Sequence, residues 1–274
     1  MTVQAQRCWL QGAQVVVRAR VFFLLIVTLV YSLCASARTV VSVAVDHAPP
    51  YSNTESSAPK GLIIDILRPI AQELNFDINV IACPFSRCVY LLTHNEVDIM
   101  GGLIRTPARE QQLQFVTPAY MALHSSFSFY SLKTPSFNIE HYNDLYGKRI
   151  AVMRGAAHFA RFDNDEKLIK VPVTSEQIAL DMLLKDRVDL FIGVEATAEH
   201  AMGVLQRPAH QLMKHPYRYQ DAIYGHMAFA SRFAGSTLAE KINQQYQKML
   251  NSGELSALVK PYALPPVMPQ NGIN

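Results

Sequence analysis

The sequence predicts an α/β protein with two similar units, each built around a largely parallel sheet. Short runs rich in β-branched residues alternate with longer stretches that have the helical period. The order strand, helix, strand, which is typical of parallel sheets, occurs twice, with a polar break at residues 133–138 between the two occurrences. One more strand and a capped helix follow the second unit, as expected for a chain that crosses between two lobes twice.

The first unit follows the signal-like N-terminal segment. Residues 40–46 (VVSVAVD) are rich in valine, and the Pro49-Pro50 pair ends that run. Apolar residues then recur every three to four positions until Leu74. The expected elements are strand 40–46, helix 62–74, strand 77–82, helix 85–94 and strand 97–100.

The second unit repeats this order. The run RIAVM predicts a strand, and Thr174 with Gln177 forms the pattern of a capping box at the start of a helix. The expected elements are strand 149–153, helix 174–185, strand 188–192 and helix 196–206.

The C-terminal part returns to the first unit. Residues 224–230 (YGHMAFA) predict a strand, and a helix follows that is capped by Thr237 with Glu240 and ended by Gly253. We expect the Pro-rich residues 263–274 to be disordered.

The first 37 residues have the features of a secretory signal peptide. They carry three arginines and no acid, and the apolar run 21–33 is too short to span a bilayer comfortably. Ala35-Ser36-Ala37 supplies the small residues that favour cleavage after Ala37. We expect export to the periplasm, with an uncleaved anchor as the alternative. Lipidation at Cys34 is a further alternative. The residue before it, Leu33, argues against lipidation because a small residue is normally needed at that position.

The remaining chain has balanced charge. Removing the three arginines leaves 22 Lys and Arg against 22 Asp and Glu in residues 38–274. This balance gives no support to nucleic acid or an anionic membrane as a partner. We also expect no cofactor.

Two cysteines remain after cleavage, Cys83 and Cys88. A zinc site needs more ligands at suitable spacing than the nine histidines provide, and redox pairs usually have two intervening residues rather than four. In an oxidising compartment we expect a disulfide between them, which would stabilise the fold by about 2 kcal/mol.

A longer pattern resembles a known family. The order VAVDHAPPYS, GLIIDILRPIAQEL, DLYGKRIAVMRGAA and ALDMLLKDRVDLFIG, with the block Thr106-Pro107-Ala108-Arg109 followed by Phe115 and Pro118-Ala119-Tyr120, resembles the family 3 extracellular solute-binding proteins over about residues 39–262. The resemblance implies a bilobal periplasmic-binding-protein type II fold. Two α/β lobes close on a ligand about a two-strand hinge, and an ABC permease in the inner membrane receives the ligand.

The resemblance also implies the division of the chain. Lobe 1 is expected to contain residues 38–130 and 225–262, and lobe 2 residues 131–224. The hinge is expected near residues 127–132 and 221–226.

The same resemblance suggests ligand-binding positions. Arg109 matches the arginine that grips an α-carboxylate, with a surface arginine as the alternative. Tyr51 matches an aromatic residue at the mouth of the cleft, with core packing as the alternative, and Phe85 matches an apolar contact to the ligand. The full set of expected ligand-binding residues is Arg109, Tyr51, Phe85, Asp46, Leu103, Ile104, Gly155, Ala156 and Glu195.

Three departures from the family pattern affect specificity. Val194 stands where amino-acid binders carry the aspartate that holds the ligand's ammonium, and Ala156 and Ile104 stand where they carry hydroxyl residues. Each lost polar partner removes roughly 1 to 3 kcal/mol, which argues against ordinary tight binding of a free α-amino acid. Glu195 replaces the missing acid if the strand end shifts by one residue. Otherwise the ligand is a carboxylate, an amine or a larger aromatic acid.

The disulfide has an expected role at this site. It brackets Phe85, so our hypothesis is that it fixes the turn and presents Phe85, together with Arg87, to the ligand.

Three functions compete. Capture of a small solute is the leading hypothesis, with no catalytic residues. The second is a lyase similar to the cyclohexadienyl dehydratases of this family, which needs an acid in an apolar cleft, with Glu195 or Asp46 as candidates. The third is a ligand-sensing periplasmic protein that signals to a membrane partner.

Overall fold

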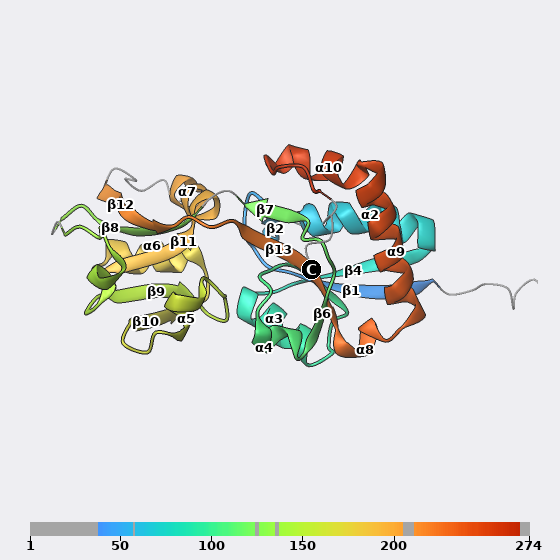
Figure 1. Cartoon of the computed structure of the whole chain (residues 1–274), viewed down its shortest axis with the longest axis horizontal. Helices are drawn as coiled ribbons and strands as arrows, with labels where there is room; N and C mark the ends of the chain where they lie inside the picture. Colours follow the sequence, from blue (N-terminus) through green and yellow to red (C-terminus); the bar gives the residue numbers. More distant parts are fainter. Residues whose placement is uncertain (1–37, 57, 124–125, 135–136, 205–210, 269–274) are drawn as a thin grey trace, which may run out of the picture. The chain divides into compact units, whose positions relative to one another are not determined.

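The computed structural model describes residues 38–56, 58–123, 126–134, 137–204 and 211–268. These residues form two α/β units, each with its own mixed sheet (Figure 1). The expected signal peptide and residues 269–274 lie outside the described part of the chain.

The first sheet has the strand order β4-β1-β5-β13-β6, and β7 also pairs with β13. Strands β1 and β5 are parallel, with Val43 opposite Ile99, whereas β13 runs antiparallel to β5, β6 and β7. The strands are β1 (Thr39–Val45), β4 (Phe76–Ala82), β5 (Ile99–Leu103), β6 (Leu113–Phe115), β7 (Met121–Leu123) and β13 (Ile223–Ala230), with the separate pair β2 (Ser52–Asn53) and β3 (Lys60–Gly61).

Seven helical segments belong to this unit in the described residues. They are α2 (Leu62–Leu74), α3 (Phe85–Thr93), α4 (Pro107–Glu110), α8 (Ser231–Ala234), α9 (Thr237–Ser252), α10 (Glu254–Val259) and the 3-10 helix η3 (Lys260–Tyr262). Helices α2, α9 and α10 contact one another (Figure 1). The buried Tyr246 of α9 donates a hydrogen bond of 2.7 Å to the carbonyl of Pro118, which ties this helix to the chain before β7.

The second sheet has the order β10-β9-β11-β8-β12. Strand β9 is parallel to β10 and β11, and β8 is antiparallel to β11 and β12. The elements are β8 (Phe127–Leu132), η1 (Tyr142–Leu145), β9 (Arg149–Met153), α5 (Ala160–Asn164), β10 (Ile169–Val173), α6 (Glu176–Leu184), β11 (Leu190–Val194), α7 (Glu195–Val204) and β12 (Leu212–Tyr219).

The chain passes from the first sheet to the second between β7 and β8, and it returns between β12 and β13. All of β8, residues 127–132, pairs within the second sheet, and all of β13 pairs within the first. The two crossings put the carboxyl ends of β1 and β11 beside the same cavity.

The two predicted helix caps were wrong by one residue. The Ser175 hydroxyl, not Thr174, accepts a hydrogen bond from the Ile178 amide, and the Ser236 hydroxyl, not Thr237, accepts one from the Ala239 amide. In both places a serine and a threonine are adjacent, and the serine is the cap. Helix α6 begins directly after Ser175, and α9 begins at Thr237, directly after Ser236. The predicted end of α9 at Gly253 is confirmed, because this glycine has φ of 81°.

Residues 263–268 lie against the first unit. Leu264 and Val267 are buried, and the Val267 amide donates to the Ser256 hydroxyl of α10. This part of the expected disordered tail is therefore packed.

Candidate functional site

A cavity of about 190 Å³ lies among residues of both units. The first unit contributes the end of β1, α3 and β7, and the second contributes the end of β11 with the first turns of α6 and α7. Most of the lining is apolar, for example Leu62, Ile63, Ile192 and Ile223. Within the described residues, Asp46 and Glu176 are the only carboxyl side chains in the lining, and Arg109 is the only Lys or Arg.

The predicted ligand-binding residues divide into two groups. Those that line the cavity are Asp46, Tyr51, Phe85, Ile104, Arg109 and Ala156. Leu103, Gly155 and Glu195 do not line it. Leu103 is fully buried in the core of the first unit, and Gly155 lines a neighbouring hollow. The structure thus brings six of the nine together, and their role in binding stays a prediction.

Arg109 reaches across the cavity from the short helix α4. Thr106 caps this helix, because its hydroxyl accepts from the Arg109 amide. The guanidinium donates to the Ile104 carbonyl at 2.7 Å and to the Gly155 carbonyl of the second unit at 2.8 Å. Burial lowers the pKa of Arg109 from its ordinary value. Arg109 therefore links the two units through backbone carbonyls, and its remaining N–H groups stay available for an anionic group.

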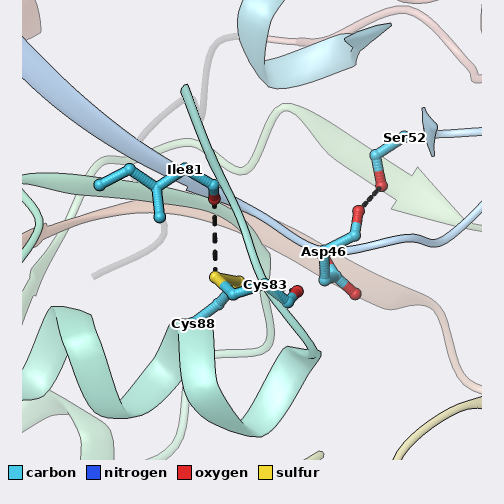
Figure 2. The surroundings of a disulfide bond; sticks show 5 residues. All are labelled: Asp46, Ser52, Ile81, Cys83 and Cys88. Atoms are coloured by element: carbon cyan, nitrogen blue, oxygen red, sulfur yellow. Dashed lines mark hydrogen bonds between the residues drawn. A yellow bond between two sulfur atoms is a disulfide. The ribbon is translucent and has the colours of Figure 1, made fainter. Parts of the chain in front are cut away.

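Asp46 lies directly after β1. Its backbone carbonyl accepts a 2.7 Å hydrogen bond from the Ser52 hydroxyl, which fixes the turn behind it (Figure 2). Burial raises the pKa of its carboxyl to about 6, although its own amide opposes this. Among the described residues, Asp46 takes part in no ion pair. Its carboxyl is thus an acid that faces the cavity without a cationic partner.

The predicted disulfide between Cys83 and Cys88 is confirmed, with a Cα–Cα distance of 5.5 Å. Figure 2 shows it close to the end of β1, where Asp46 lies. The Cys83 amide donates to the Val45 carbonyl at 3.1 Å, so the turn that leads into α3 is bonded to the residue before Asp46. Phe85 lies between the two bonded cysteines, and this turn is hydrogen-bonded to the residue before Asp46, so the disulfide lies beside two residues that line the cavity.

Arg87 lies away from the cavity, contrary to the expectation that the disulfide presents it to the ligand together with Phe85. Arg87 is exposed, forms an ion pair with Glu96 at 3.3 Å and lies over the Tyr90 ring. It does not line the cavity because it lies on the outer side of α3.

Glu176 is a site residue that the sequence analysis missed. It is the first residue of α6, and its Oε1 lies 2.8 Å from the Thr197 hydroxyl of α7. Burial raises the pKa of Glu176 to about 7. An acid in the first turn of a helix is common because it complements the helix dipole, so nothing in the sequence separated Glu176 from that ordinary role. The position of Glu176 could have indicated a site residue, because it follows the parallel strand β10 and ligands bind at the carboxyl ends of parallel strands.

Glu195 has a different environment from the one expected for a ligand-binding acid. It forms an ion pair with Lys214 and accepts a hydrogen bond of 3.2 Å from the Ser126 hydroxyl. The hydrogen bond from Lys214 lowers the pKa of Glu195. Because Lys214 already satisfies this carboxylate outside the cavity, Glu195 is not placed to replace the acid missing at Val194.

The arrangement suits a small organic ligand. Two carboxyls and one guanidinium are set into apolar walls, and no ion pair of the described residues joins them. In the described part of the chain, no group of three or more His, Cys, Asp or Glu is placed to hold a metal ion. The charged side chains of Asp46, Glu176 and Arg109 can orient a charged solute by direct contacts.

Comparisons with known proteins identify the family of the chain. Residues 41–265 match the family described as bacterial extracellular solute-binding proteins, family 3. A relative from Escherichia coli (strain K12), the putative ABC transporter arginine-binding protein 2, is 24% identical over 228 residues, which is 81% of this chain and 90% of the relative.

Solved structures show the same fold. The amino acid ABC transporter substrate-binding protein AbpA from Streptococcus pneumoniae, bound to L-arginine, has a TM-score of 0.64 at 20% identity, over 81% of this chain and 93% of AbpA. A histidine kinase sensor domain with similarity to periplasmic binding proteins has a TM-score of 0.69 at 17% identity, over 84% of this chain and 98% of that domain. The expected type II periplasmic-binding-protein fold is confirmed. With a family match over most of its length, the chain belongs to the family 3 bacterial extracellular solute-binding proteins.

Proposed function

We propose that this protein captures a small charged solute, an amino acid or a related amine or carboxylate, in the cavity between its two lobes and delivers it to an ABC importer. The observation that carries the proposal is the cavity itself, with acids from both units and Arg109 inside apolar walls. A site built from two units favours closure around the ligand, because the bound solute completes contacts on both sides. The arginine-binding relative supports the importer role.

We assign roles in ligand binding to the residues that line the cavity. Arg109 binds an anionic group of the ligand through the N–H groups that the two backbone carbonyls leave free. Tyr51 and Phe85 pack against its apolar part, since both line the cavity and are only partly exposed. The carboxyls of Asp46 and Glu176 face the same space.

We also propose how the chain is exported and in which form it works. Residues 1–37 direct export and are removed, the mature chain works as a monomer in the periplasm, and it neither binds nucleic acid nor catalyses a reaction. The family supports a place outside the cytoplasm. The hinge is proposed at the two crossings between β7 and β8 and between β12 and β13.

A thermal-shift screen tests the proposal. Protein exported with its own N-terminal segment is purified from the periplasm and heated with amino acids, amines, dicarboxylates and aromatic acids. A ligand at a hundredfold over its Kd adds about 2.7 kcal/mol to the free energy of unfolding, which raises Tm by a few degrees. If no compound in any of these classes raises Tm, the proposal fails.

One observation favours a second candidate. Glu176 combines a pKa of about 7 with a mostly apolar cavity, which is what a general acid needs at neutral pH. A lyase similar to the cyclohexadienyl dehydratases would use this property. Incubation with each compound that raises Tm, followed by product analysis, distinguishes the two functions, because a binding protein returns its ligand unchanged.

A further inference from the structure

The end of β11 is where the missing acid would act. The last residue of this strand, Val194, lines the cavity and offers no charge. Glu195, the neighbouring acid, is satisfied by Lys214 and Ser126. If these were the only groups at this end of the cavity, no acid of the second unit would face the ligand.

Glu176 reaches the same place from a different element. The Thr197 hydroxyl lies 2.8 Å from Oε1 of Glu176 and 3.1 Å from the carbonyl of Val194, so the carboxyl lies beside the strand end. A Cβ atom added to Gly193 would lie 3.3 Å from the same Oε1. Because Gly193 has no side chain, the Glu176 carboxyl can lie close to the backbone at this point of β11.

The hydrogen bonds around Glu176 do not compensate a negative charge. Thr197 has one hydroxyl proton and two acceptors within reach, Glu176 and the carbonyl of Val194. When the proton goes to Val194, the carboxyl keeps its own proton and donates it to Thr197. An ionised Glu176 has at most this one donor, and in the described residues it has no cationic partner. An ionised Glu176 therefore lacks a cation that would compensate its charge.

Asp46 presents a second carboxyl to the same cavity from the first unit. Both carboxyls line the cavity, and the charge of Asp46 opposes ionisation of Glu176. A cation between them would relieve that repulsion and satisfy both acids. It would also connect the two units, since one acid follows β1 and the other begins α6.

We propose that Glu176 takes the place of the acid missing at Val194 and that, with Asp46, it anchors a cationic head of the ligand, a primary ammonium or a guanidinium. This inference rests on the proposed function, and it narrows the solute to an organic cation, with or without a carboxylate for Arg109. It also identifies Glu176, rather than Glu195, as the acid that determines specificity.

Titration calorimetry at pH 8 tests it with defined probes. L-Arginine and agmatine share a guanidinium but differ in the α-carboxylate, while citrulline and succinate supply the neutral and anionic comparisons. The variants are Glu176→Gln and, as the matched control, Glu195→Gln, which removes an acid that lies outside the cavity. Cooperative melting of each variant checks that it is folded.

We expect the wild type to bind at least one cationic probe. Glu176→Gln should lose about 10- to 100-fold in affinity for that probe, and the larger loss corresponds to one charge-assisted hydrogen bond. The affinity of Glu195→Gln should change less than about threefold. Equal affinity of Glu176→Gln and wild type would overturn the inference, as would an equal loss in the control. Wild-type binding of succinate or citrulline alone would also overturn it and leave the proposed function intact. If no compound in the thermal-shift screen raised the Tm of the wild type, both this inference and the proposed function would be rejected.

Discussion

The substitution Glu176→Gln should stabilise the ligand-free protein at alkaline pH. Glutamine keeps the size and the hydrogen-bonding capacity toward Thr197 but removes the buried charge. The carboxyl has a pKa of about 7 in the folded state and an ordinary value of 4.5 in the unfolded chain. Above pH 7 both states are ionised, and the folded state carries the cost of burying the charge.

The size of the effect follows from the two pKa values. Their difference of about 2.5 pH units, at 1.36 kcal/mol for each unit, gives about 3 kcal/mol. The unfolded state loses its proton first, so the free energy of unfolding falls as pH rises from 4.5 to 7, and this contribution is flat outside that window. The variant should lack this fall. It should therefore gain about 2 to 3 kcal/mol over wild type between pH 5 and pH 8.

Urea unfolding followed by circular dichroism at these two pH values measures the difference. Glu195→Gln is the control of opposite sign, because Lys214 lowers the pKa of Glu195 and the variant should lose stability at neutral pH. Parallel pH dependence of wild type and Glu176→Gln would refute the reasoning, since it would mean that the Glu176 carboxyl is solvated.

Three further variants test the packing of the first unit. Replacing Cys83 and Cys88 by serine should cost about 2 kcal/mol of stability and weaken binding of any ligand found by screening, because the turn before Phe85 is no longer fixed; unchanged Tm and affinity would contradict this. Tyr246→Phe should cost about 1 to 3 kcal/mol in urea unfolding, since the buried Pro118 carbonyl loses its donor; a neutral effect would mean that water replaces it. Ile66→Ala in α2 should cost about 2 to 5 kcal/mol by cavity formation while ligand affinity stays at the wild-type value, and a large affinity loss would contradict its purely structural position.

The order of the main elements could be predicted because their hydrophobic periods are clear. Helix α2 and strand β9 have the predicted bounds. Strands β10 and β12 were not identified, and each contains a proline, Pro172 and Pro216. Proline weakens a strand signal because it removes a ladder donor, and it is tolerated here because both strands are at the edges of the second sheet.

The candidate site was predictable where a motif carried the signal. The block around Arg109 and the spacing of the two cysteines led to residues that the structure places at or beside the cavity. Glu176 could not be found in this way, because its place beside the cavity depends on contacts with Thr197 and the end of β11, which are about twenty positions away in the sequence. Glu195 was adjacent to the expected position, but the sequence does not show that Lys214 binds it.

A crystal structure of the protein grown with L-arginine, or with the compound that raises Tm most in the screen, tests the central claim most directly. The account predicts ligand density in the cavity, with a cationic group within hydrogen-bond distance of Asp46 and Glu176 and an apolar part against Phe85. Density for the ligand outside this cavity, or in it with both carboxyls unoccupied, would contradict the account.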